Sequence, residues 1–303
     1  MSDKRVGMIG MGLMGTAFSQ RLIDAEYEVI GFDPEASRMV DHETRGGTVV
    51  DSPRAVAAAV PMAILSLPNN AVGTVVCFGD SGIAGCGNED LLVLDTTTGH
   101  PDAAVEFASG LAEHGIRFMD ATMSGNSIQA AAGDLVAMLG GSDENAAQAA
   151  DVMAVLSRSV HHVGEVGAAS RAKLVVNLLL GVTRTALAEG LVMGEKAGLD
   201  LDKLLAVLKD SAAYSKAMDI WGQRMVDGDF FPPGSRAKQS HKDSKVITTY
   251  GREIGSPTML SSVVQQLLQF AEMTGLGEAD NAGAIEVQRR LAGIGRIHFD
   301  KDD

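Results

Sequence analysis

Cysteine is scarce in this 303-residue chain, which contains only Cys77 and Cys86. Two thiols at this spacing supply neither a disulfide framework nor a zinc motif. We therefore expect both to be reduced, as small hydrophobic side chains, in a cytoplasmic protein. We expect no metal site, because the adjacent His161 and His162 would point to opposite faces of a strand.

The chain also has few positively charged residues and no long apolar run. The chain has 25 Lys and Arg against 39 Asp and Glu, a formal net charge of −14. Nucleic acid and anionic membranes would repel such a chain, so we expect neither as a partner. The most apolar run, LVVNLLLGV at 174–182, is interrupted by Asn177 and is too short to span a bilayer. The N-terminus does not resemble a signal peptide.

Tandem repeats and low-complexity linkers are absent, and the pattern of the chain changes once, near residue 164. Before this point, short apolar runs alternate with segments of helical period, which predicts βαβ units around a mostly parallel sheet. After it, only helical periods follow, beginning with one long helix over 167–197. We expect an α/β domain over 1–164 and an all-helical domain over 165–303. The expected strands are 5–9, 28–33, 62–67, 91–96, 116–121, 135–139 and 160–164.

The first expected strand ends in GMGLMG, a G-x-G-x-x-G pattern at Gly10, Gly12 and Gly15. In a dinucleotide site, Gly10 permits the tight turn, Gly12 lets the backbone approach a pyrophosphate, and Gly15 lets the helix pack on the strand. The anion would then lie at the helix N-terminus. A tight turn without a ligand is the alternative. Met11, Leu13 and Met14 complete the predicted cofactor loop.

Asp33 ends the second expected strand, where a carboxylate would accept hydrogen bonds from the ribose hydroxyls of a dinucleotide. A 2′-phosphate would meet the negative charges of Asp33 and Glu35, so NAD is favoured over NADP. Arg38 keeps NADP open, because it lies one helical turn on and could reach a phosphate.

Further segments resemble a known family in order and spacing: SLPNN (66–70), LDTTTGHP (94–101), DATMSGNSIQAAAG (120–133), GEVGAASRAKLVVN (164–177) and HKD (241–243). With GMGLMG they resemble the β-hydroxyacid dehydrogenases, whose best-known member is 3-hydroxyisobutyrate dehydrogenase. The resemblance covers nearly the whole chain. It implies an NAD(P)-binding Rossmann domain and an all-α substrate and dimerisation domain joined by a long helix. It also implies hydride transfer between nicotinamide and a small 3-hydroxy acid or its semialdehyde, in a homodimer or homotetramer.

The same resemblance assigns roles to individual residues. Ser124 and Gly125 would hold the substrate carboxylate, with Asn126 beside them. Lys173 and Asn177 would be catalytic. Three positions depart from the family's patterns: Thr122 replaces Pro, while Asn126 and Ala169 replace Gly, which leaves the particular acid open. The remaining cofactor contacts would be Leu67, Pro68, Asn69, Thr98 and Lys242, while Asp243 would be structural.

Lys173 and Asn177 lie four residues apart, on one face of the expected long helix. Reduction of an aldehyde needs a proton donor and the reverse oxidation needs a base, and a lysine serves for both. Its usual pKa of ~10.4 is too high, but desolvation lowers it, and catalytic lysines titrate at roughly 7–8. Asn177 could hold the substrate hydroxyl and orient the ammonium. The alternative for Lys173 is a surface lysine that buries only its stem.

Two other functions remain as alternatives. One is an imine reductase-type enzyme that acts on C=N, a group that usually carries another residue at the position of Lys173. The other is a non-catalytic dinucleotide-binding interaction module, which would be expected to have lost this lysine. His241, beside Lys242, is expected on a solvated helix face.

Overall fold

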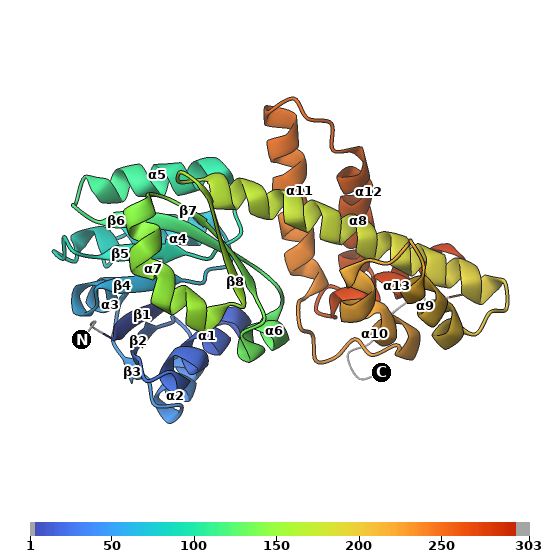
Figure 1. The fold of residues 1–303 in the computed structure, drawn as a ribbon, viewed down its shortest axis with the longest axis horizontal. Helices are drawn as coiled ribbons and strands as arrows, with labels where there is room; N and C mark the ends of the chain where they lie inside the picture. The colour runs from blue at the N-terminus through green and yellow to red at the C-terminus, as the bar shows by residue number, and fades with distance from the viewer. Residues whose placement is uncertain (1–3, 295–303) are drawn as a thin grey trace. The chain divides into compact units, whose positions relative to one another are not determined.

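The computed structural model describes residues 4–294, which form two compact units divided between Lys173 and Leu174. The first unit is an α/β domain and the second is helical (Figure 1). The long helix α8 (Ala168–Lys196) belongs to both and joins them.

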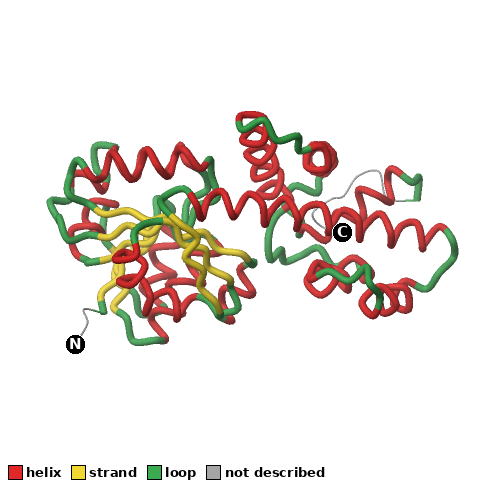
Figure 2. Tube along the Cα trace, turned by 45° about the horizontal axis from the view of Figure 1, so that its top comes forward, coloured by secondary structure: helices red, strands yellow, loops and turns green. Residues whose placement is uncertain are grey.

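The first unit is built on a β-sheet, drawn in yellow in Figure 2. The sheet has eight strands in the order β3-β2-β1-β4-β5-β6-β7-β8. Only the β6–β7 pair is antiparallel among the described pairs. The fold class is confirmed. The expected strand list missed one strand, β3, which has only two residues. The strands are β1 (Arg5–Ile9), β2 (Glu28–Phe32), β3 (Thr48–Val49), β4 (Met62–Leu65), β5 (Leu92–Asp95), β6 (Arg117–Ser124), β7 (Val136–Gly140) and β8 (Ser159–Gly164).

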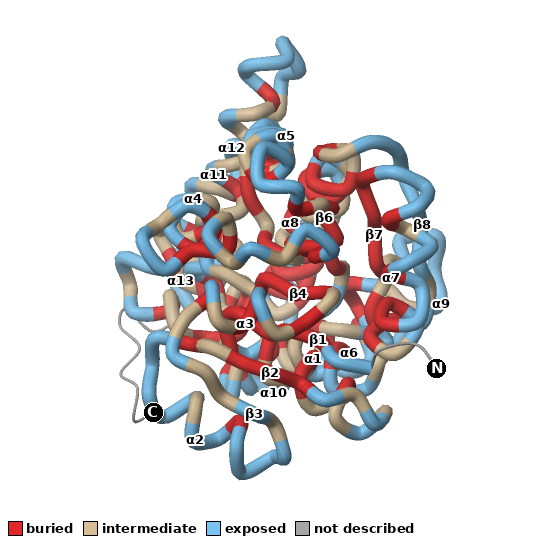
Figure 3. The backbone as a smooth tube through the Cα atoms, turned by 90° about the vertical axis from the view of Figure 1, so that its left-hand side faces the viewer, coloured by how far each residue is buried: buried red, intermediate tan, exposed pale blue. Residues whose placement is uncertain are grey.

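Helices cover both faces of this sheet, so its central strands are buried on both sides (Figure 3). In β4, Met62 and Ile64 enter one apolar core while Ala63 and Leu65 enter the other. This explains why the strand reads as an unbroken apolar run. The helices are α1 (Leu13–Asp24), α2 (Ala36–Thr44), α3 (Pro53–Ala59), α4 (Asn70–Phe78), α5 (Pro101–Ala112), α6 (Ser127–Ala132) and α7 (Asp143–Leu156), with a 3-10 turn at Ile83–Gly85.

The strand order reverses between β1 and β4, because β2 and β3 extend the sheet on one side and β5 to β8 on the other. In open α/β sheets, ligands bind at the carboxyl ends of the strands beside such a reversal. GMGLMG follows β1, Asp33 follows β2 and SLPNN follows β4. The fold therefore brings these three predicted segments to one edge of the sheet.

The second unit has its own apolar core, which includes Leu187, Leu191, Leu205, Trp221 and Ile285. Within it, α11 and α12 lie side by side (Figure 1). After α8, its helices are α9 (Leu201–Asp210), a π-helical turn (Met218–Gly222), α10 (Gln223–Asp227), α11 (Ala237–Glu253), α12 (Met259–Met273), a 3-10 turn (Asn281–Gly283) and α13 (Ala284–Leu291).

By length and composition alone, α8 is apolar enough to cross a membrane. The nine-residue run considered in the sequence is thus part of a longer apolar segment. A core helix passes the same test, and α8 contributes Leu187, Leu191 and Val192 to the core of the second unit.

Candidate active site

The three glycines of the loop GMGLMG differ in the space around them. Gly10 has φ 92°, which favours glycine, and a Cβ there would collide with the carbonyl oxygen of Ser66. A Cβ on Gly15 would collide with the carbonyl of Gly10, so this glycine permits close packing of α1 against the strand end. By contrast, a Cβ on Gly12 would meet nothing within 4 Å. The loop is tight on the protein side and has open space at the glycine expected to face a pyrophosphate.

Asp33 is fixed beside this loop and is only 4% exposed. Its carboxylate accepts hydrogen bonds from the N–H of Met11 at 2.7 Å and from the N–H of Glu35 at 2.9 Å. Arg38 also pairs with it at 3.1 Å, through a side chain that is half exposed. The two backbone bonds hold the carboxylate in place, whereas Arg38 is the partner that can leave toward solvent.

The ends of β4 and β5 are tied together at the same edge of the sheet. The N–H of Leu67 donates to Oγ1 of Thr97 at 3.2 Å, and the N–H of Thr97 donates to Oδ1 of Asp95 at 2.9 Å. Asn69 is exposed, and its Oδ1 accepts a hydrogen bond from Val72 N–H at 3.0 Å, which caps α4. Pro68 is exposed and Thr98 is half-buried.

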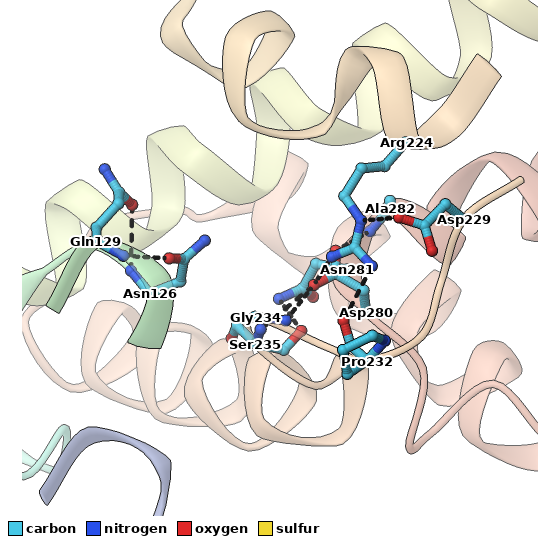
Figure 4. A network of polar contacts seen from close by, with 10 residues as sticks. All are labelled: Asn126, Gln129, Arg224, Asp229, Pro232, Gly234, Ser235, Asp280, Asn281 and Ala282. Carbon is cyan, nitrogen blue, oxygen red and sulfur yellow. Dashed lines mark hydrogen bonds and ion pairs between the residues drawn. The ribbon is translucent and has the colours of Figure 1, made fainter. Parts of the chain in front are cut away.

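The predicted carboxylate-binding residues lie where β6 passes into α6. Ser124 is the last residue of β6, and Gly125 has φ 139°. Asn126 is the N-cap of α6: its side chain accepts from Gln129 N–H at 3.0 Å, while Gln129 Oε1 accepts from Asn126 N–H at 3.2 Å (Figure 4). The capping box therefore occupies the side-chain oxygen and the backbone N–H of Asn126.

A buried carboxylate, Asp120, joins β6 to the first turn of α8. It is 1% exposed, and its two oxygens accept from the N–H of Gly167 at 2.8 Å and of Ser170 at 2.7 Å. Burial raises the pKa of Asp120, and the hydrogen bonds from Gly167 and Ser170 oppose that shift. These N–H groups have no acceptor within the helix, so the carboxylate satisfies them as a helix cap.

Two of the departures from the family's patterns contact one another in the same place. Thr122, two residues after Asp120 on β6, donates from Oγ1 to the carbonyl oxygen of Ala169 at 3.0 Å. Lys173 follows one turn later and is 8% exposed. Little of this residue is exposed, and its role stays a prediction. We call the three bonds made by Asp120 and Thr122 the β6–α8 dock.

In the second unit, Asn177 and Lys242 share one carboxylate. Nδ2 of Asn177 donates to Oδ2 of Asp243 at 3.1 Å, and Nζ of Lys242 lies 2.9 Å from Oδ1 of the same residue. Asp243 thus connects two residues that the sequence placed in the site, one on α8 and one on α11.

Family models match both halves of the chain. Residues 5–164 match the NAD binding domain of 6-phosphogluconate dehydrogenase, and residues 167–288 match a model described as NAD-binding of NADP-dependent 3-hydroxyisobutyrate dehydrogenase. The chain belongs to the β-hydroxyacid dehydrogenase family. It is therefore an NAD(P)-dependent oxidoreductase of a family that acts on small hydroxy acids, and the non-catalytic alternative is set aside.

Individual members of the family are similar over almost their full length. The 2-(hydroxymethyl)glutarate dehydrogenase of Eubacterium barkeri is 29% identical over 290 residues, which cover 96% of each chain. A solved structure of 3-hydroxyisobutyrate dehydrogenase from Mycobacterium tuberculosis with L-serine is 26% identical, with a TM-score of 0.85 over 94% of this chain and 99% of that one. An imine reductase from Streptomyces aurantiacus is 18% identical, with a TM-score of 0.62 over 93% of this chain and 99% of that one, and shares the fold alone.

In this β-hydroxyacid dehydrogenase, the loop before α11 is anchored by another buried carboxylate, Asp280 (Figure 4). Its Oδ2 accepts from Gly234 N–H at 2.8 Å and from Ser235 N–H at 3.3 Å, and it lies 2.9 Å from NH1 of Arg224. Arg184 of α8 is also buried. Desolvation lowers its pKa to about 10 and the charge of Asp280 opposes this shift. Two backbone N–H groups of this loop thus donate hydrogen bonds to the same carboxylate, which holds the loop in place.

Some of these contacts were not predicted from the sequence, and the expectation that His241 lies on a solvated helix face was wrong. That residue is 2% exposed, and its Nδ1 lies 2.8 Å from Oε2 of Glu272. It lies inside the second unit and not on a solvated face. The bonds of Asp120 and the link through Asp243 were also missed, because each joins residues 47 to 66 positions apart.

Among the described residues, no group of three or more His, Cys, Asp or Glu could hold a metal ion.

Gly140 of β7 lies against the β6–α8 dock, with no room for a side chain. A Cβ there would collide with Oδ1 of Asp120 and lie 2.9 Å from the N atom of Ala169. We expect Gly140→Ala to lower the free energy of unfolding by about 1–3 kcal/mol, because overpacking displaces the dock. Denaturant unfolding of the whole chain measures the change.

Gly190→Ala in α8 is the matched control, since a Cβ there would meet nothing within 4 Å. It should leave stability unchanged or raise it by roughly 0.5–1 kcal/mol, as alanine does in a helix. Equal stability of the two variants would show that the dock tolerates a side chain at Gly140.

Proposed function

We propose that this chain interconverts a small 3-hydroxy acid and its semialdehyde, with Lys173 as the general acid and base. The observation that carries the proposal is the β6–α8 dock. It holds the start of α8, and with it the buried Lys173, against the strand that ends in Ser124. The side chain proposed to transfer the proton and the segment proposed to bind the carboxylate thus belong to two elements that are hydrogen-bonded to each other.

The proposed roles of the protein residues follow from their chemistry. The substrate carboxylate is bound by the hydroxyl of Ser124 and the N–H of Gly125. In the direction of reduction, Nζ of Lys173 donates a proton to the carbonyl oxygen, which becomes the hydroxyl of the product. In oxidation, the neutral amine takes that proton back. Asn177 orients the substrate oxygen, and Asp243 holds the Asn177 amide through its Nδ2.

The residues at the carboxyl edge of the sheet fit an NAD(P) cofactor. The open space at Gly12 and the α1 N-terminus, which has no side-chain cap, suit a pyrophosphate. Asp33 suits a ribose. When bound, the nicotinamide supplies or accepts the hydride. Backbone contacts at Met11, Leu13 and Met14, together with Leu67, Pro68, Asn69, Thr98 and Lys242, complete the proposed cofactor contacts.

We further propose that NAD is preferred over NADP. The carboxylate of Asp33 has about four acceptor positions, and Arg38 uses those that Met11 and Glu35 leave. The ribose hydroxyls of NAD can replace Arg38, which then moves into solvent. A 2′-phosphate in the same place would meet a buried negative charge, a repulsion that Arg38 offsets only in part.

The remaining features of the proposal concern assembly and location. Exposed apolar side chains on α12, at Met259, Leu260 and Val263, suit a homodimer or homotetramer. The low cysteine content suits the cytoplasm. We propose residues 1–164 as the cofactor domain and 165–303 as the substrate and dimerisation domain.

Substitution of Asp33 tests the cofactor preference. We expect Asp33→Asn to lower the ratio of kcat/KM for NAD to that for NADP by roughly 10- to 100-fold, since hydrogen bonds to a charged group contribute about 1.5–3 kcal/mol. Steady-state kinetics with both cofactors measures the ratio. Arg38→Ala is the control and should keep the preference for NAD. Unchanged selectivity in Asp33→Asn would remove Asp33 as the determinant.

Substitution of Lys173 tests the proposed function. Turnover is first measured with 3-hydroxyisobutyrate, 3-hydroxypropionate, glycerate and 2-(hydroxymethyl)glutarate, each with NAD and NADP. On the best of these substrates, Lys173→Ala should lower kcat by a factor of about 10²–10⁴, because general acid–base catalysis is lost. Calorimetric titration should show that NAD still binds.

The control is Arg171→Ala, which removes an exposed cation two residues earlier on α8. It should keep turnover near that of the unmodified chain. Near-normal turnover in Lys173→Ala would show that another group transfers the proton.

A further inference from the structure

The hydroxyl of Thr122 and the backbone N–H of Lys173 share one acceptor. Thr122 is fully buried, and its Oγ1 donates to the carbonyl oxygen of Ala169 at 3.0 Å. In an α-helix the N–H of residue i donates to the carbonyl of residue i−4, so the same oxygen accepts from Lys173. The regular pattern is already present two residues earlier, where Arg171 N–H donates to Gly167 O at 3.0 Å. A carbonyl oxygen has two lone pairs and can accept both bonds.

We propose that Thr122 is a positioning residue, which sets the place of Lys173 relative to the carboxylate-binding end of β6. This inference rests on the proposed function of Lys173. The contact joins two positions at which the chain departs from the family's patterns, Thr122 and Ala169. It is therefore a property of this chain, outside the contacts that the resemblance implies.

The Thr122–Ala169 bond lies close in the chain to both proposed functional groups, the hydroxyl of Ser124 and the ammonium of Lys173. Ser124 is two residues beyond Thr122, about 6.6 Å along the strand, and alternation places both side chains on one face. Lys173 is four residues beyond Ala169, about 6 Å along the helix. A shift at this bond moves the proton donor relative to Ser124.

The hydroxyl restricts a movement that Asp120 alone leaves open. Through one carboxylate, Asp120 holds the N–H of Gly167, just before α8, and the N–H of Ser170 in its first turn. Thr122 adds a bond to a carbonyl, from a second position on the same face of β6. Because a β-branched side chain has few χ1 rotamers, the threonine hydroxyl is well placed to fix the rotation of this turn.

The test removes the hydroxyl while it keeps the shape. Thr122→Val should lower kcat on the best hydroxy acid about tenfold, because small displacements of a reacting group cost up to roughly 10²-fold. The KM for NAD should stay within about twofold, since the cofactor loop is elsewhere on the sheet. Thr122→Ser, which retains the hydroxyl, should restore kcat to within about twofold.

A second pair keeps the test valid if valine is not tolerated. Thr122→Ala and Thr122→Ser both lack the methyl group, so they differ only in the hydroxyl. A purely structural role would lower the activity of both, whereas the positioning role predicts that only the alanine variant loses kcat.

Two outcomes would overturn the inference: normal kcat in the variants without the hydroxyl, or equal losses in serine and alanine. Lys173→Ala, measured beside them, separates this failure from failure of the proposed function. If Lys173→Ala is inactive and Thr122→Val is normal, only the positioning role is wrong. If Lys173→Ala keeps its turnover, the proposed function is wrong and the positioning role falls with it.

Discussion

Asp120 makes the contact on which the arrangement of the first unit's candidate site depends. Its carboxylate bonds two N–H groups at the start of α8, and the strand that carries it ends in Ser124. A buried carboxylate is costly unless hydrogen bonds and favourable dipoles surround it. Here the N-terminus of α8 supplies both. The hydrogen bonds that stabilise the buried carboxylate of Asp120 therefore also hold the helix that carries Lys173.

Neighbouring residues leave space for the contact between Asp120 and α8 and add a further hydrogen bond to it. Gly140 leaves room for the carboxylate and for the backbone of Ala169, and Thr122 adds a bond to the next turn. The edge of the sheet proposed to bind the cofactor has a similar arrangement of a buried carboxylate and a neighbouring glycine. There Asp33 is held by backbone N–H groups, and Gly12 leaves space open where a ligand is expected. In both places, buried carboxylates position the backbone that the proposed chemistry requires.

Much of the fold could be predicted from the sequence, because it rests on local signals. Periodicity distinguished the α/β half from the helical half, and the position of GMGLMG between a strand and a helix located the proposed cofactor edge. The two-residue β3 was missed because it is too short to show alternation. The family patterns also pointed to Lys173 and Asn177, whose roles remain predictions.

The contacts that link the site residues could not be predicted. Asp120 and Gly167 are 47 positions apart, and no periodic pattern pairs them. The role of Asn126 as a helix cap depends on Gln129, a spacing that the sequence contains but that was interpreted as part of a substrate pocket. His241 seemed solvated because it stands beside Lys242, yet its ring packs inside the second unit against Glu272.

Native-state hydrogen exchange tests the central claim, that Asp120 fixes the first turn of α8. The N–H groups of Gly167 and Ser170 have no acceptor within the helix, so their protection depends on this carboxylate. We expect both to exchange as slowly as the N–H groups of β6, and we expect Asp120→Ala to make both exchange faster. Exchange at the rate of the exposed Glu165 in the unmodified chain would contradict it.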